Sequence, residues 1–428
     1  MASRMTAVAP SAARLTDSLR DIGYDFSSAV ADLVDNSITA GATQVDILVE
    51  FDAEHSRVLI ADNGLGMTVN GLTEAMRFGS RRAYGRGDLG RYGLGLKTAS
   101  LSQGRSLTVL TRKEGVRRPI LTRQLDLDLV IEFDDWLIVE PERTDVIDNA
   151  RKLLEDGCGT VVIWEKLDRV VPSRNAAGGW ARRRFETIAD KAAQHLSMVF
   201  HRFLAAEAKT GPVAITVNGK KLQPWDPFAR SERLTKELAE EVFEIQHGDT
   251  TGSVRLRRYV LPGRDHFSSH AEFERHSGPL KWNRQQGLYT YRADRLVQWG
   301  GWSGIRGIDE HTKLARASVD FDTDLDSAFN INVAKMRVSI PAQLRQMIER
   351  PINEMCSIAD EVYRKSAGSK PSEEKDKQKS GSDQLTQASD IGLALQAAAL
   401  EAGEYKAFKK IASTLRRSDP DVAAALGI

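Results

Sequence analysis

The segment at residues 29–41, AVADLVDNSITAG, constrains the fold most, because its apolar residues recur at the spacing of an α-helix. Asp32 and Asn36 are four residues apart, so they stack one turn above the other on the polar side of this predicted helix. A carboxylate can accept a proton from water, and an amide oxygen can bind a hard cation such as Mg²⁺. For this helix taken alone, the alternative is a solvated polar face.

A β-hairpin is predicted directly after this helix, since apolar and polar residues alternate over 45–51 and again over 58–60. We expect one face of this hairpin to be covered. Its second strand runs into DNGLGM at 62–67. Glycines there permit a tight turn and let a ligand approach the backbone. Asp62 can accept a hydrogen bond from an amino group such as that of adenine. A plain turn capped by Asp62 is the alternative.

Residues 79–95 contain six glycines and four arginines. Ordering such a stretch costs much conformational entropy, so we expect it to become ordered around a ligand. GRYGLGLKTAS at 90–100 then runs into a helix, and backbone amides at a glycine-rich helix start suit phosphates. The stretch lacks the preceding strand of a dinucleotide fold and the GKS or GKT ending of a P-loop. The sequence therefore predicts a different nucleotide-binding geometry.

Taken in order, these motifs resemble the GHKL ATPase family, which includes gyrase B, heat-shock chaperone ATPases, histidine kinases and MutL. The fourth motif is Gly159-Thr160, which opens a strand. DLVDNSITAGATQVDI is similar to MutL and to the MORC ATPases, whereas FGS followed by GRYGLGLK resembles MORC. GLYTYRADRL at 287–296 also resembles a MORC segment, so the resemblance covers about residues 20–340.

The resemblance implies a Bergerat α/β sandwich, in which helices cover a mixed sheet and ATP binds between helices and a lid. It implies that Asn36 binds Mg²⁺ and that Asp62 binds the adenine amino group, with help from Thr160 through a water. The remaining ATP-binding residues that it implies frame the base or wrap the phosphates: Gly64, Gly66, Met67, Gly90, Gly93, Gly95, Leu96 and Lys97.

The position of the general base departs from the family pattern. Hydrolysing members have Glu four residues before the Asn, and this chain has Asp32, whose side chain is one methylene shorter. A general base contributes about 10²–10⁴ in rate, so a displaced carboxylate is expected to give a slow ATPase. Asp35, next to Asn36, points about 100° away from Asn36 on the helix wheel and is a poor substitute for Asp32.

A second α+β domain is predicted beyond a long helical pattern at 180–207, and it resembles the transducer domain of gyrase B and MutL. That domain sends a lysine onto the γ-phosphate, and Lys335 is the best match; the alternative is a surface lysine. We predict an ATP-binding domain at 1–180, a transducer-like domain at 181–365, a disordered linker at 366–384 and a helical tail at 385–428. The strands expected here are 213–217, 242–246, 253–260, 287–291 and 315–321, followed by a helix from Pro341.

Other polar residues have simpler interpretations. We expect packing or surface roles for His195 and His201, and a solvated loop rather than a metal site around His266, His270 and His276. Two basic clusters, together with the arginines of residues 79–95, could contact a phosphate backbone, whereas each cluster alone would be a solvated face. The clusters are Arg182–Arg184 and the group of Arg255, Arg257 and Arg258.

Composition excludes several classes. The net charge of +1 gives no global attraction to nucleic acid or membrane. Cys158 and Cys356 are far apart, which argues against a disulfide framework and favours a reducing cytosol. No apolar run reaches the length of a membrane span and no signal peptide is recognisable, so we expect a soluble, cytoplasmic protein without a membrane partner.

The sequence thus predicts a Mg²⁺-dependent, slowly hydrolysing ATPase that forms a homodimer on ATP binding and acts on DNA or with a DNA-processing or defence partner. The alternatives are a non-catalytic, nucleotide-dependent interaction module and a chaperone-type ATPase. A histidine kinase is disfavoured, because only about thirty residues precede the Asn36 helix.

Overall fold

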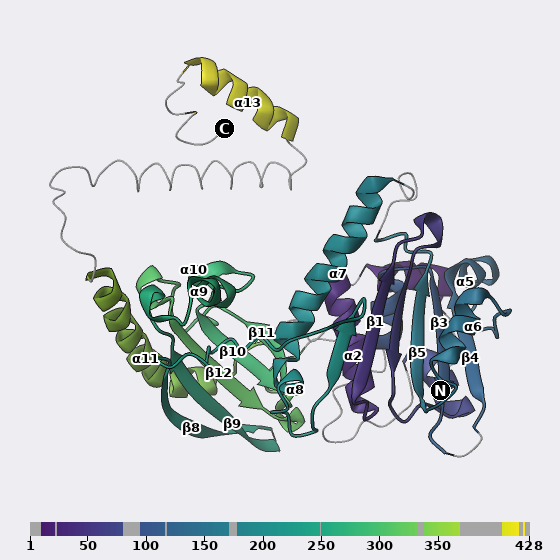
Figure 1. The fold of residues 1–428 in the computed structure, drawn as a ribbon, viewed down its shortest axis with the longest axis horizontal. Helices are drawn as coiled ribbons and strands as arrows, with labels where there is room; N and C mark the ends of the chain where they lie inside the picture. The colour runs from purple at the N-terminus through teal and green to yellow at the C-terminus, as the bar shows by residue number, and fades with distance from the viewer. Residues whose placement is uncertain are drawn as a thin grey trace, which may run out of the picture. The chain divides into compact units, whose positions relative to one another are not determined.

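Two mixed β-sheets organise the chain (Figure 1). The structure, a computed structural model, describes residues 10–21, 24–79, 95–115, 118–170, 178–248, 250–331, 338–368, 405–418 and 423. Within these residues the strand orders are β4-β3-β5-β2-β1-β6-β7 and β11-β10-β12-β9-β8. The chain divides into two units, Met1–Gly368 and Ser369–Ile428, and both sheets belong to the first. The predicted fold class, α/β with a further α+β region, is confirmed.

The first sheet contains the predicted hairpin. β1 pairs antiparallel with β2, and β2 pairs antiparallel with β5, so that Asp62 lies opposite Thr160. β6 runs parallel to β1 and extends this sheet, so the assignment of strand 213–217 to the second domain is wrong. The strands are β1 (Gln44–Glu50), β2 (Arg57–Asp62), β3 (Ser106–Arg112), β4 (Ile120–Asp126), β5 (Gly159–Glu165), β6 (Ala214–Val217) and β7 (Lys220–Lys221).

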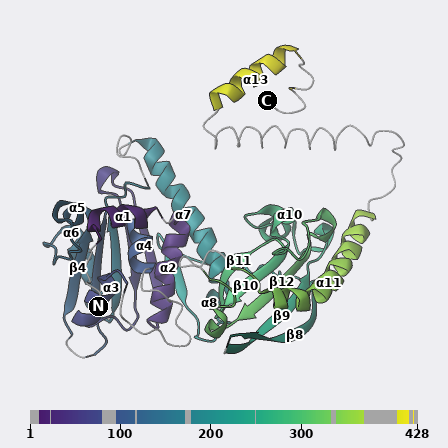
Figure 2. The same cartoon turned by 180° about the vertical axis from the view of Figure 1, so that it is seen from behind.

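Helices cover both faces of this sheet (Figures 1 and 2). The expectation of one covered face holds for β1, whose residues alternate between buried and half-buried, and is wrong for β2, where three consecutive residues, 58–60, are buried. One face packs against α2 (Phe26–Thr39) and α7 (Gly179–Val199), and the other packs against α6 (Asp145–Lys152). The remaining helices of this region are α1 (Ala12–Arg20), η1 (Ala53–His55), α3 (Val69–Met76), α4 (Gly95–Leu101), α5 (Leu127–Phe133) and α8 (His201–Leu204).

Helix α2 is buried on nearly all sides. Asp25 caps its N-terminus by accepting a hydrogen bond from the Ser28 backbone amide. Asp32 is 2% exposed and Asp35 is fully buried, whereas Asn36 is exposed. The interpretation of a solvated polar face is therefore wrong at Asp32, because the start of α4 lies beside its carboxylate, and it holds at Asn36.

The second sheet packs against α11 (Ala342–Gly368), whose Leu344, Ile348 and Ile352 enter its core. Strand β11 was not predicted, and the solvated loop expected around His270 is wrong, since α9 forms there and buries His276. The elements are β8 (Lys236–His247), β9 (Thr250–Val260), η3 (Arg264–His266), α9 (His270–His276), α10 (Lys281–Gln285), β10 (Gly287–Arg292), β11 (Arg295–Trp299), η4 (Glu310–Thr312), β12 (Ala315–Phe321) and η5 (Thr323–Leu325).

The predicted domain limits stay predictions, and the sheet topology favours a first boundary between β7 and β8 rather than at residue 180. Residues 366–368 close α11, so the linker cannot begin at 366; the rest of the predicted linker lies outside the described residues. In the predicted tail, α13 spans Tyr405–Ser418. Among the described residues, no helix combines the length and the hydropathy that crossing a membrane requires.

Candidate functional site

The Asp62 carboxylate, at the end of β2, accepts hydrogen bonds from three directions. Its Oδ1 accepts from the backbone amides of Gly64 at 2.9 Å and Thr160 at 3.2 Å. Its Oδ2 accepts from the Ser37 hydroxyl of α2 at 3.0 Å. Burial raises the pKa of Asp62, and these hydrogen bonds offset part of that rise. A carboxylate offers about four acceptor positions, so the Oδ2 side keeps capacity for one more donor.

Two glycines allow the strands around Asp62 to approach closely. Gly66 has φ +60°, and a Cβ there would lie 2.0 Å from the Arg112 carbonyl oxygen. Gly159 has φ +149°, and a Cβ there would lie 2.0 Å from the Asp62 carbonyl oxygen. Larger residues would therefore push β3 or β5 away from the turn that follows Asp62.

Thr111 of β3 is a site residue that the sequence did not indicate. Its hydroxyl accepts from the Met67 backbone amide at 2.9 Å, donates to the Gly159 carbonyl at 2.9 Å and lies 3.2 Å from the Thr160 hydroxyl. Thr111 therefore joins the glycine turn to the start of β5. No motif surrounds it, and only strand pairing reveals it.

The structure brings Asp32 close to the start of α4. The Tyr24 hydroxyl donates to Asp32 Oδ2 at 2.7 Å, and a Cβ built on Gly95 would lie 3.4 Å from the same oxygen. Burial and the neighbouring Asp32 raise the pKa of Tyr24 well above its usual value, so the phenol stays protonated and keeps donating. Tyr24 was not predicted as a site residue.

An arginine from the second sheet reaches the same helix. Arg295, at the start of β11, pairs with Asp35 at 2.8 Å, and its Nη2 lies 4.0 Å from Asp32 Oδ1. Asp35 is therefore engaged by Arg295, and its being a poor substitute for Asp32 stays a prediction. His195 of α7 lies nearby, and burial together with Arg295 lowers its pKa to about 4, so it packs as a neutral side chain as expected.

Lys97 of α4 points to α3 in this structure. Its Nζ donates to the Ala75 carbonyl at 3.0 Å and lies 5.9 Å from the centre of the Phe78 ring. Burial lowers its pKa to about 8. The phosphate contact expected of Lys97 stays a prediction, as does that of the half-buried Leu96. Three further predicted site residues lie outside the described residues, namely Gly90, Gly93 and Lys335.

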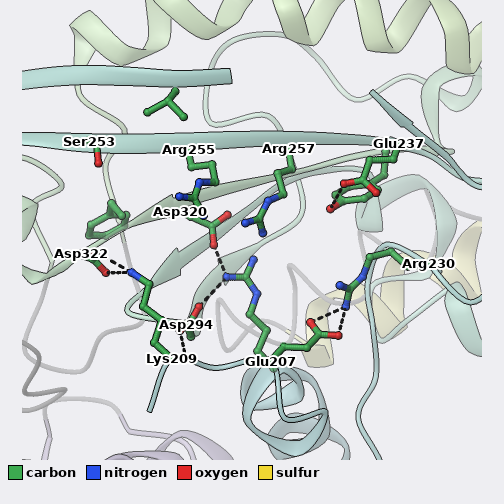
Figure 3. A pocket seen from close by; sticks show the side chains of 14 residues that line it. Glu207, Lys209, Arg230, Glu237, Ser253, Arg255, Arg257, Asp294, Asp320 and Asp322 are labelled. Carbon is green, nitrogen blue, oxygen red and sulfur yellow. Dashed lines mark hydrogen bonds and ion pairs between the residues drawn. The ribbon is translucent and has the colours of Figure 1, made fainter. Parts of the chain in front are cut away.

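Figure 3 shows a cleft of ≈ 610 Å³ at the second sheet, which contains none of the predicted site residues. Its charges are largely paired. Arg202 of α8 pairs with Asp294 at 3.2 Å and with Asp320, while Lys209 pairs with Asp322 at 3.1 Å. These contacts tie α8 to the β10–β11 turn and to β12. The paired charges of this cleft therefore hold α8, the β10–β11 turn and β12 together, and they leave few groups to bind a ligand.

A second cleft of ≈ 910 Å³ lies beside α7, with Tyr24 in its wall. It is predominantly basic, because Asp21 and Asp25 face a larger number of cations. Those cations are Arg20, Arg169, Arg183, Arg184 and Lys191.

The basic cluster predicted on β9 is partly wrong. Arg258 is 5% exposed and donates to the Pro351 carbonyl of α11 at 3.1 Å, so it cannot share a surface with its neighbours. Arg255 and Arg257 both pair with Glu240. Within the described residues, His, Cys, Asp and Glu form no group of three or more that could hold a metal ion.

Comparison with known proteins shows one family match and several relatives. Residues 24–160 match the family model described as histidine kinase-, DNA gyrase B-, and HSP90-like ATPase. Mouse ATPase MORC2B is 37% identical over 91 residues, which are 20% of this chain and 9% of the relative. ATPase morc-1 of Caenorhabditis elegans is 38% identical over 98 residues, 22% of this chain and 11% of the relative.

Protein MICRORCHIDIA 5 of Arabidopsis thaliana is 24% identical over 155 residues, 32% of this chain and 22% of the relative. The chain thus matches only between 9% and 22% of the length of these curated relatives. The resemblance predicted from the motifs is confirmed: residues 24–160 match the model of the histidine kinase-, DNA gyrase B-, and HSP90-like ATPases, and MORC ATPases are among the proteins to which the chain is similar.

Proposed function

We propose that this chain binds ATP and hydrolyses it slowly. The observation that carries the proposal is the Asp62 carboxylate, which three donors fix in place and which keeps an acceptor position for the adenine amino group. An adenine there would lie beside Gly64, Gly66 and Met67. This constellation belongs to the segment that matches the ATPase family, which supports ATP over other ligands with an amino group.

Magnesium is the implied metal, and the residues present fit it. The Asn36 side chain is exposed on α2, one turn from Asp32, and offers a neutral amide oxygen. One protein ligand suffices, because Mg²⁺ in nucleotide sites keeps several waters and phosphate oxygens. When bound, the ion would offset the negative charge of the triphosphate.

Asp32 is the proposed general base. The Tyr24 hydroxyl fixes the orientation of its carboxylate, and burial keeps bulk water away from it. The shorter side chain, relative to the Glu of hydrolysing members, supports slow turnover. The same substitution supports the second candidate function, a nucleotide-dependent interaction module that binds ATP without hydrolysis.

The test compares wild type with Asp32→Ala in phosphate-release and calorimetry experiments. We expect Asp32→Ala to bind a non-hydrolysable ATP analogue like wild type and to lose about 10²-fold or more in turnover. Equal turnover in both proteins would exclude Asp32 as the base. Normal binding with no turnover in wild type would instead favour the interaction module.

We also propose that ATP closes a homodimer and that Lys335 reaches the γ-phosphate from the second domain. A ligand shifts such an equilibrium only by its differential affinity for the closed form, so ADP should shift it far less than ATP. Light scattering without nucleotide, with ADP and with the analogue tests this. Dimer mass should grow with the analogue, and Lys335→Ala should weaken the response; an unchanged monomer throughout would remove the dimer proposal.

A DNA or DNA-processing partner and a cytoplasmic location stay predictions. The cleft beside α7 offers better support for DNA than the β9 arginines do, because Arg183 and Lys191 are exposed there. Phosphate contacts would make binding fall steeply with salt. Fluorescence anisotropy with duplex DNA at low and physiological salt should show that dependence and lose it in the Arg183→Ala/Lys191→Ala variant; salt-independent or absent binding would count against DNA.

A further inference from the structure

We infer that Arg295 is a positioning residue, which fixes the Asp32 carboxylate and thereby couples the second sheet to the ATP-site helix. The inference rests on the proposed function and deepens it. Arg295 belongs to β11, yet its side chain is 5% exposed, and its guanidinium contacts α2 as well as the Leu296 carbonyl of its own strand. Its Nε lies 2.8 Å from Asp35, and its Nη2 lies 4.0 Å from Asp32.

Arg295 lies beside two buried carboxylates. Asp32 and Asp35 are three residues apart on α2, so they lie on neighbouring positions of the helix surface, and both are almost completely buried. Like charges interact strongly away from water, and a buried charge without a partner is costly. Arg295 faces both carboxylates and offsets both charges.

Two described groups near Asp32 carry no positive charge of their own. Tyr24 donates a neutral hydroxyl, and His195 stays neutral above about pH 4 because its pKa is lowered to about 4. Asp25 adds a further negative charge near His195. Loss of Arg295 would remove the positive charge that lies 2.8 Å from Asp35 and 4.0 Å from Asp32, so we expect stronger repulsion between the two carboxylates and a shift of the Asp32 carboxylate from its present orientation.

The turn that carries Arg295 is itself anchored. Ala293 and Asp294 both have positive φ, 45° and 68°, which is the geometry of a tight type I′ hairpin turn. Asp294 accepts from Arg202 Nη1 at 3.2 Å and from the Lys209 backbone amide at 2.9 Å (Figure 3). The β10–β11 turn is thus tied to α8 through Asp294 and to α2 through Arg295. A displacement of the second sheet would consequently reach Asp32.

Arg295→Met removes the charge while keeping an unbranched apolar stem. We expect kcat for ATP to fall by about 10- to 100-fold, since a small misplacement of a catalytic group has that effect. Affinity for a non-hydrolysable ATP analogue should stay within about threefold, because Asp62 and Asn36 are untouched. Arg295→Lys keeps the charge and should recover part of kcat.

The matched control is Arg258→Met. Arg258 is also a buried arginine of the second sheet, but it pairs with Glu354 and donates to the Pro351 carbonyl, both on α11. Both variants should lower the unfolding temperature, and only Arg295→Met should lower kcat in protein that is fully folded at the assay temperature. A kcat in Arg295→Met equal to that of the control would overturn the inference.

A readout independent of turnover separates this inference from the proposed hydrolysis. In wild type, the analogue should slow hydrogen exchange in α2 and also in residues 287–299. In Arg295→Met the protection of α2 should remain, and that of 287–299 should disappear. If wild type binds the analogue but shows no turnover, the proposed hydrolysis is refuted, and the exchange pattern alone then tests the coupling through Arg295. Unchanged protection of residues 287–299 in Arg295→Met would overturn the inference.

Discussion

Asp62→Asn should damage nucleotide recognition while leaving the fold nearly intact. The carbonyl oxygen of the new amide can replace Oδ1 and accept from Gly64 and Thr160. The amide nitrogen then replaces Oδ2 and donates to the Ser37 hydroxyl, which can in turn donate to the Leu33 carbonyl at 3.2 Å. All three hydrogen bonds have a replacement, so we expect the free energy of unfolding to change by about 1 kcal/mol or less.

The spare acceptor position is on Oδ2, and in the variant a donor occupies it. Losing a hydrogen bond to a charged acceptor costs about 1.5–3 kcal/mol, and an unsatisfied adenine amino group adds about 1–3 kcal/mol. Taking about 3 kcal/mol as the sum gives a loss of roughly 150-fold in affinity. Guanine carries a carbonyl where adenine carries the amino group, so the variant should lose much less affinity for a GTP analogue than for the ATP analogue.

Calorimetry with Mg²⁺ and each analogue measures both affinities, and thermal unfolding checks the fold. Asp46→Asn is the matched control, because Asp46 is a half-buried strand carboxylate that pairs opposite Ala61 and so faces the other side of the sheet. It accepts from the Thr216 hydroxyl at 2.7 Å, which an amide oxygen can also do. If Asp62→Asn binds the ATP analogue as tightly as Asp46→Asn does, Asp62 is not the adenine residue.

Two further predictions concern the metal and pH. Asn36→Ala should reduce the affinity for the ATP analogue in excess Mg²⁺ to the value that wild type shows in EDTA, and calorimetry with and without the metal checks this; a variant that still responds to Mg²⁺ as wild type does would remove Asn36 as a ligand. Burial lowers the pKa of His195 to about 4 and that of His201 to about 3 in the folded protein. An unfolded histidine has a pKa of about 6.5, so below that pH the unfolded chain binds more protons than the folded protein does. The stability that the two neutral histidines contribute is complete above pH 6.5 and is lost as pH falls, by up to about 1.4 kcal/mol per pH unit for each histidine. Urea unfolding measured from pH 7 to 5 should therefore show a smaller loss in the free energy of unfolding for His201→Gln than for wild type.

Local features of the site could be predicted from the sequence, because short-range chemistry dictates them. The helical spacing of residues 29–40, the alternation that forms β1 and β2, and the glycines of 62–67 are each specified within about a dozen residues. The strand predicted at 315–321 coincides with β12 for the same reason. Asp62 is the last residue of β2, as the sequence predicted.

Features that depend on distant segments could not be predicted in this way. Periodicity assumes that the polar side of a helix faces water, and at Asp32 another helix covers it. Arg295 and Asp35 are separated by 260 residues, and each alone reads as an ordinary surface charge. β6 belongs to the first sheet because it pairs with β1, and nothing in the sequence of residues 214–217 predicts that pairing.

The packing around Asp32 bears on the choice between a slow ATPase and a non-catalytic module. The Tyr24 hydroxyl donates to its Oδ2 at 2.7 Å, and Arg295 Nη2 lies 4.0 Å from its Oδ1. The carboxylate of a glutamate would lie one methylene further from α2, so Tyr24 and Arg295 would have to shift to keep both contacts. The positions of these two partners therefore suit an aspartate. A carboxylate that is oriented by a tyrosine and balanced by Arg295 has the features of a maintained catalytic group, and this favours slow hydrolysis over a site in which catalysis has been lost.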